Sequence, residues 1–466
     1  MNQTIPIEVD DVQALVFRGH GDFPHSEALW LSLADAAAAR GPLRTLVTER
    51  VCFGRGRPGE VHPRAQLLFS AEGLRLLGAA GEAVEACHRP FGQGMTAPQR
   101  VRTLGDAGRN HPDGWRWSDR AAHVLVLIYA PTAEAARAEA GRVERALSPD
   151  CAVIHKLTTQ LPADEREPFG FRDGLARTFV RVGDGSDRGP AEDLLPPGEV
   201  VLGYRDATGE EPTVHDLFLN GSFVVVRQLE QDVRGFWQFW REQADGDDTE
   251  AVWLAAKALG RWPNGMPVRS GPPGPEPALD EEVAERPLAF QGDPHGTGCP
   301  IGSHVRRANP RDALVPDVNV SRDVIALHRM MRRGRTYGTV PPPDWYPRGQ
   351  RREDPALGPT LADDEKGLLF VSLCGDISRQ FEFIQQSWLN HPKHADLQDE
   401  TDPIAGGDGI AGNGCFFSVP TDGIRRRVGG VKGWVTVRGG GYFLMPGRRA
   451  LRTLLAADEL SERAPL

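Results

Sequence analysis

The sequence predicts an α+β fold built from two split β-α-β units with mostly antiparallel sheets, and three observations predict it. Strand-like apolar runs alternate with helical stretches in the first half, the order restarts near residue 216, and polar Gly/Pro-rich stretches lie between the halves at 182–198 and 263–286. This pattern is ferredoxin-like. We therefore expect two ferredoxin-like domains, 1–198 and 199–466.

The first half supplies the elements of one unit. Residues 11–20 predict a strand, 26–41 a helix that ends at Gly41, and 65–78 a strand that runs into a helix. Residues 123–130 ("HVLVLIYA") are a continuous apolar strand, 132–147 an Ala/Glu/Arg-rich helix, and 151–160 a closing strand.

The second half repeats the pattern without repeating the sequence. Residues 216–230 predict a hairpin with Asn220-Gly221 at its turn, and a helix follows that carries Phe236, Trp237 and Trp240. Later come a strand at 367–374, a helix at about 376–388 with one apolar stripe, and a last hairpin at 433–447.

Composition excludes several classes of function. The chain has 54 basic and 64 acidic residues and no basic tract, so a nucleic-acid groove or an anionic membrane surface is not expected. The longest apolar run is too short to span a bilayer, and no basic-then-apolar leader opens the sequence. Six scattered cysteines without a C-x-x-C argue against covalently attached haem and favour a reducing cytoplasm.

Two segments contain residue types that are common in catalytic and metal-binding sites. "EPFGFRDGLA" (167–176) places Asp173 in a Gly-rich run, which by itself predicts a tight turn. "CPIGSHVRRANPRDA" (299–313) places His304 beside several arginines. A surface histidine in a basic loop is one interpretation. A haem site is the other, because neutral imidazole ligates iron and guanidinium groups pair with propionates.

Two more segments complete the set. "LHRMMRRGRTYG" (327–338) holds His328, a rival ligand. If the segment is helical, His328 projects from the same side as Arg332, and the two could not lie on opposite faces of one haem. "GLLFVSLCGDISRQFEF" (367–383) directs Leu368 and Phe370 to one face of a strand, where they form an apolar wall.

Together these segments resemble the dye-decolourising peroxidases. "NGSFVVVRQLEQDV", "KALGRWPNGMPV" and the opening "VDDVQALVFRGHGDFPH" are similar to further blocks of that family, the last to its longer bacterial subgroup. The blocks stand in family order over most of the chain. The resemblance implies a haem peroxidase that reduces hydrogen peroxide and oxidises bulky aromatic or dye-like donors. It also implies one non-covalent haem b per chain, enclosed by the two domains.

Matching residues imply the roles in the site. His304 would be the proximal iron ligand, Asp173 the distal acid–base and Arg332 the distal arginine, with Arg333 as the fallback. The remaining implied contacts with the cofactor are the apolar wall and a propionate partner: Leu368, Phe370 and Arg307. Some subgroups carry an asparagine two residues after the distal arginine; here that residue is Gly334, which puts the substrate range in doubt.

Several points stay open on the sequence alone. The second nitrogen of His304 needs an acceptor, for which Asp376 is the first candidate and Glu382 the second. A protein that only binds or releases haem is the alternative function, although binding does not require the Asp173–Arg332 pair. Trp388 and Tyr337 are candidates for a surface-radical route. Whether the chain forms a homo-oligomer is left open.

Overall fold

In a computed structural model the strands form one large sheet that contains both predicted units. The structure describes residues 6–56, 62–148, 150–175, 177–185, 187, 193–342, 345–347, 364–406, 415–421 and 423–456. The strands of the sheet are β1 (His25–Leu33), β2 (Arg64–Phe69), β3 (Trp117–Ser118), β4 (Val124–Ala130), β5 (Cys151–Gln160), β8 (Ser222–Gln231), β9 (Met331–Arg332), β10 (Arg335–Tyr337), β11 (Gly367–Cys374) and β14 (Val435–Met445). All pairings between these strands are antiparallel except that of β3 with β14.

The strand order confirms the ferredoxin-like fold. The first unit runs β5-β1-β4-β2 and the second β14-β8-β11-β9, so each places its fourth, first, third and second strands side by side. β2 joins β14, and β10 pairs with both β5 and β11, so the sheet closes on itself. We propose that the boundary between the two domains lies near residue 198, in the segment between β5 and β8.

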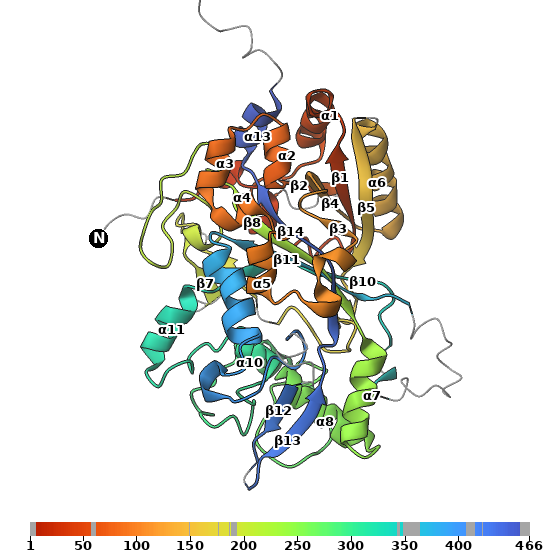
Figure 1. The fold of residues 1–466 in the computed structure, drawn as a ribbon, viewed down its shortest axis with the longest axis vertical. Coiled ribbons are helices and arrows are strands. Elements are labelled where there is room, and N and C mark those ends of the chain that lie inside the picture. The colour runs from red at the N-terminus through yellow and green to blue at the C-terminus, as the bar shows by residue number, and fades with distance from the viewer. Residues whose placement is uncertain are drawn as a thin grey trace, which may run out of the picture.

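Helices lie at both ends of the molecule (Figure 1). In the first unit α6 (Ala133–Leu147) lies against β1 and β4, and α1 (Ala36–Glu49) packs on α6. The helices that follow β2 are α2 (Ala71–Leu76), α3 (Gly81–Cys87), α4 (Arg89–Gln93) and α5 (Pro98–Leu104). α13 (Arg448–Leu455), near the C-terminus, packs on α1. At the other end lie α7 (Val233–Gln243), α8 (Asp248–Leu259) and the β12–β13 hairpin (Cys415–Val419, Arg426–Val431).

The expected strands at 123–130, 151–160 and 367–374 are confirmed, as are the helix at 132–147 and the strand-then-helix at 65–78. The first two elements were predicted wrongly. Residues 9–11 and 14–16 form two 3-10 turns. The strand is β1, which includes the large apolar residues that we assigned to the helix at 26–41, and α1 begins only at Ala36. β1 lies between β4 and β5 and is buried from Ser26 through Leu31, although Ser26 and Glu27 are polar. It therefore carries no alternation of buried and exposed residues that would mark it as a strand.

Both predicted hairpins of the second half are also wrong. Residues 216–220 form a turn that leads into β8, with Asn220 at a positive φ of 61°. The last hairpin is a single strand, β14. Its Gly439 lies at a register shift against β8. The Trp117 ring lies where a side chain of residue 439 would be, so the glycine allows this close packing and does not form a turn.

The helix expected at 376–388 is present but is wound as two π-helical segments, Ser378–Glu382 and Ile384–Leu389. The predicted apolar stripe is buried: Ile377, Phe381, Ile384 and Trp388. Of the two Gly/Pro-rich stretches, 263–286 is mostly exposed from residue 269 onward, and 182–198 lies partly outside the described residues. Among the described residues no helix is both long and apolar enough to cross a membrane.

Candidate active site

A cavity of about 340 Å³ brings distant segments of the chain together. It is bounded by β8 and β11, by the loop that contains Asp173, by α10 (His304–Ala308) and by the π-helical segments. Five of the predicted site residues line it: Asp173, His304, Arg332, Leu368 and Phe370. Asp173 and His304, which are 131 positions apart in the chain, thus line the same cavity.

His304 is the first residue of α10, and its ring is held by a buried carboxylate. Nδ1 lies 3.1 and 3.0 Å from Oδ1 and Oδ2 of Asp402. Because a carboxylate can only accept, Nδ1 carries the proton and the lone pair is on Nε2, which has no hydrogen-bond partner in the described part of the chain. Burial alone would lower the pKa of His304, but the charge and hydrogen bond of Asp402 outweigh it and raise the pKa.

Asp402 is itself fixed by the backbone. Its Oδ1 accepts the N–H groups of Ile404 at 2.9 Å and Ala405 at 2.7 Å. Burial raises the pKa of this carboxyl, but His304, the Ala405 amide and the charge of Arg307 together lower it below its usual value. The carboxylate is therefore ionised and orients the imidazole.

The predicted acceptors Asp376 and Glu382 are wrong for this role. Asp376 accepts from His88 Nε2 at 3.0 Å and from the Arg379 N–H at 2.9 Å. Burial would raise the pKa of Asp376, but His88 and Arg379 lower it to about 2. Glu382 accepts from Arg100 at 2.6 Å and from the Tyr442 hydroxyl at 2.8 Å. Both acids therefore bind residues other than His304, and Asp402 is the acceptor for the second nitrogen of His304.

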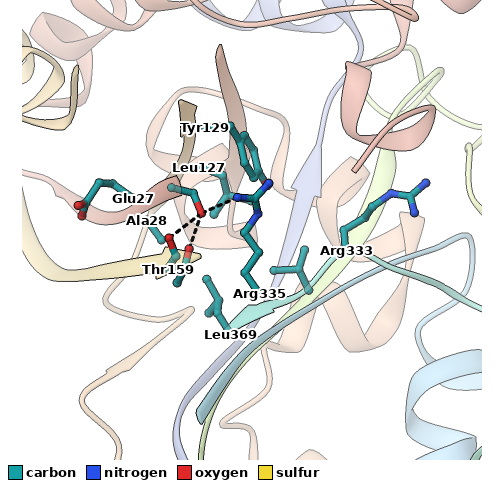
Figure 2. A pocket seen from close by; sticks show the side chains of 10 residues that line it. Glu27, Ala28, Leu127, Tyr129, Thr159, Arg333, Arg335 and Leu369 are labelled. Atoms are coloured by element: carbon teal, nitrogen blue, oxygen red, sulfur yellow. Dashed lines mark hydrogen bonds between the residues drawn. The ribbon is translucent and has the colours of Figure 1, made fainter. Parts of the chain in front are cut away.

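Strand alternation separates Arg332 from Arg333. Arg332, Leu368 and Phe370 line the large cavity, whereas Arg333 and Leu369 line a small pocket inside the closed sheet, shown in Figure 2. Arg333 donates to the carbonyls of Leu15 at 2.9 Å and Val16 at 3.1 Å. Arg332 is thus the arginine that faces the site, and the fallback Arg333 does not.

Asp173 lies in a turn that also faces the cavity. Its N–H donates to the carbonyl of Glu165 at 2.8 Å, and its Oδ1 accepts the Gly174 N–H at 2.7 Å, with Gly174 at a φ of +80°. The tight turn expected from Asp-Gly therefore exists, and it directs an acid into the cavity.

A second acid, Glu167, lines the same wall and was not singled out from the sequence. Burial raises the pKa of Glu167 to about 7, while hydrogen bonds from Gln231, Phe171 and Phe169 act to lower it.

Arg307 does not face the cavity, so its expected role as a propionate partner is wrong. It is fully buried and donates to the backbone carbonyls of Trp388, His391 and Glu400, which ties α10 to the loop after the π-helical segments. The cations that do line the cavity are Arg172, Arg177, Arg227, Arg261, Arg311, Arg329 and Arg332.

His328 also lines the cavity, but the reason that we gave against it was wrong. α11 (Val318–Ala326) ends before His328, and Arg332 is in a strand, so the two do not share a helix. The His328 ring instead stacks on Phe383, with centroids 3.9 Å apart, and its Nδ1 bonds to the carbonyl of Arg379. Burial lowers the pKa of His328, and no carboxylate of the described residues binds its ring as Asp402 binds that of His304.

The chain is similar to known proteins over nearly its full length, although no family model matches it. It is 28% identical to "Multifunctional dye peroxidase DyP2" of an Amycolatopsis species, over 96% of both chains. It is 26% identical to "Dye-decolorizing peroxidase msp1" of Mycetinis scorodonius, over 83% of this chain and 75% of that one.

Solved structures show the same fold. An ancestral D-type dye-decolourising peroxidase superposes with a TM-score of 0.80 at 23% identity, over 97% of this chain and 100% of that one. A DyP-type peroxidase of an Anabaena species gives 0.76 at 21% identity, over 96% and 94%. The curated relatives, the shared fold and the ordered sequence blocks agree, and they confirm that the chain resembles the dye-decolourising peroxidases.

Proposed function

We propose that this protein is a haem peroxidase in which His304 ligates the iron, Asp173 moves the proton and Arg332 stabilises the developing charge. The observation that carries the proposal is one cavity that joins an imidazole, oriented by a buried carboxylate, with an acid and a permanently charged arginine. A protein that only stores haem needs the first of these features and not the other two.

The residues of the cavity fit a non-covalent haem b, one per chain. The Nε2 lone pair of His304 is available as a ligand, because Nδ1 is engaged with Asp402. Apolar walls suit a porphyrin, and they comprise Leu368, Phe370, Phe381, Ile384 and Trp388. Arg177, Arg311 and Arg329, which also line the cavity, are the candidates to pair with the propionates in place of Arg307.

Haem supplies the iron centre at which peroxide is cleaved, and the chain supplies the acid–base chemistry. The Asp173 carboxylate accepts a proton from one peroxide oxygen and delivers it to the departing one. The Arg332 guanidinium remains charged and stabilises the negative charge that develops on that oxygen. Leu368 and Phe370 keep this space apolar and limit competing water.

The reducing substrate that we propose is a bulky aromatic compound. The curated relatives are named for dye decolourisation, and one solved structure of the family is a complex with 2,6-dimethoxyphenol. Trp388 and Tyr337, the two residues suggested for a radical route, are both buried. A cytoplasmic location is also part of the proposal, supported by six scattered cysteines without a C-x-x-C.

Turnover of an aromatic dye tests the function against its alternative. Purified protein that shows a Soret band should decolourise an anthraquinone dye with hydrogen peroxide, and Asp173→Ala should lose most of this activity while it keeps the band. If the wild-type protein holds haem but turns over no dye or phenol, the haem-handling alternative replaces the peroxidase.

Asp402 should affect haem affinity, and Asp376 should not. Partners that orient a metal-ligating histidine typically contribute about 10–100-fold in affinity. We therefore expect Asp402→Asn to weaken haem binding by that range in a titration of the haem-free protein. Asp376→Asn is the matched control, because it makes the same change in an acid that bonds to His88. Weaker binding in the control than in Asp402→Asn would show that the proximal acceptor has been assigned wrongly.

A further inference from the structure

The carboxylate of Glu167 is surrounded by hydrogen-bond donors next to the site. Its Oε1 accepts the N–H of Phe171 at 3.0 Å, and its Oε2 accepts the N–H of Phe169 at 3.0 Å. The Gln231 amide donates a third bond to Oε2 at 2.7 Å. A side chain that satisfies two amides of its own loop determines the path of that loop.

The backbone closes around this carboxylate. The Glu167 N–H donates to the Phe171 carbonyl at 2.9 Å, and the Gly170 N–H donates to the Glu167 carbonyl at 2.7 Å. Gly170 has a φ of +97°, and the Tyr346 ring lies where a Cβ would be, so a side chain at this position is excluded. Both polar groups of the Phe171 backbone are thus fixed to Glu167, two residues before Asp173.

Gln231 connects the loop to the sheet that forms the apolar wall. It is the last residue of β8, and two residues earlier Leu229 pairs with Leu368 of β11. The bond between Gln231 and Glu167 therefore links the segment of Asp173 to the strands that carry Leu368 and Phe370. Phe171 adds packing to this link, since its ring stacks on Trp237 of α7.

We propose that Glu167 is a positioning residue that holds Asp173 where it can accept the peroxide proton. The proposal rests on the proposed function of Asp173. Proton transfer requires heavy atoms within about 2.6–3.2 Å, and a displacement of about 1 Å can slow a reaction about 100-fold. Without the Glu167 carboxylate the loop still contains Asp173, but the amides of Phe169 and Phe171 that precede it are no longer held in place.

Glu167→Gln and Glu165→Gln form a matched pair of variants. The first leaves at least one of the two amides without an acceptor, because an amide side chain has a single oxygen. The second removes a charge from the same loop but only an exposed contact with Arg172, and the backbone carbonyl that binds the Asp173 N–H is unchanged. Stopped-flow mixing with peroxide should show a Soret change about 10- to 100-fold slower in Glu167→Gln and unaltered in Glu165→Gln.

Hydrogen exchange gives a readout that does not depend on turnover. The amides of Phe169 and Phe171 should exchange faster in Glu167→Gln than in wild type, and at the wild-type rate in Glu165→Gln. If Glu167→Gln does not fold, Gln231→Met replaces it, since that change removes one donor and leaves the bonds within the loop intact. It should also slow the reaction with peroxide.

The double variant Glu167→Gln/Asp173→Asn separates positioning from an independent effect. If Glu167 acts through Asp173, the double variant is as slow as Asp173→Asn alone. Multiplied effects, or a normal rate in both Glu167→Gln and Gln231→Met, would overturn the inference. A normal rate in Asp173→Asn would instead overturn the proposed function, so the two failures are distinguishable.

Discussion

His304→Ala is expected to abolish stable haem binding, with loss of the Soret band from the purified protein. The variant removes the protein–iron bond that we propose, while Asp402 alone is expected to contribute about 10–100-fold to affinity through that same ring. The loss of affinity in His304→Ala should exceed that range. A titration of the haem-free protein, followed at the Soret maximum, measures it.

His328→Ala is the control, because His328 lines the same cavity and its Nδ1 bonds to the carbonyl of Arg379 instead of a carboxylate. It should leave the Soret position unchanged and lower the thermal stability, since the ring stacks on Phe383. Loss of haem in His328→Ala with retention in His304→Ala would reverse the assignment of the ligand.

Asp173→Asn is expected to slow the reaction with peroxide by about 10²–10⁴-fold while the haem stays bound. Asparagine serves an Asp-Gly turn as well as aspartate does, so the fold of the loop is kept and only the proton acceptor is lost. Stopped-flow mixing with peroxide, monitored at the Soret band, measures the rate. Asp164→Asn, an exposed change in the same loop, should leave the rate unchanged.

Arg332→Leu should slow the same step, because it removes the charge that stabilises the departing oxygen. The effects of Asp173→Asn and Arg332→Leu should be non-additive, since both groups act in one transition state. A normal rate in Asp173→Asn together with a slow Arg332→Leu would make the arginine the main catalyst and reduce Asp173 to a turn residue.

Local patterns in the sequence determined the strands at 123–130, 151–160 and 367–374 and the helix at 132–147, because these stretches carry a long apolar run or a helical composition of their own. The first strand and both hairpins could not be read in this way. β1 is covered on both faces. Gly439 leaves room for the Trp117 ring, which comes from 322 residues away in the chain. Burial by distant segments is not visible in a local window.

The same distinction holds for the site. The motifs around Asp173, His304, Leu368 and Phe370 were sufficient to select residues that share one cavity. Only the tertiary structure decided the partner of His304, because Asp402 lies 98 residues away in a loop without a motif of its own. It also directed Arg307 toward three backbone carbonyls. It placed Arg332, the last residue of β9, and Arg333, which follows it, in different cavities. A sequence determines which groups are available, whereas their direction depends on backbone conformation and on contacts that form only when distant segments pack.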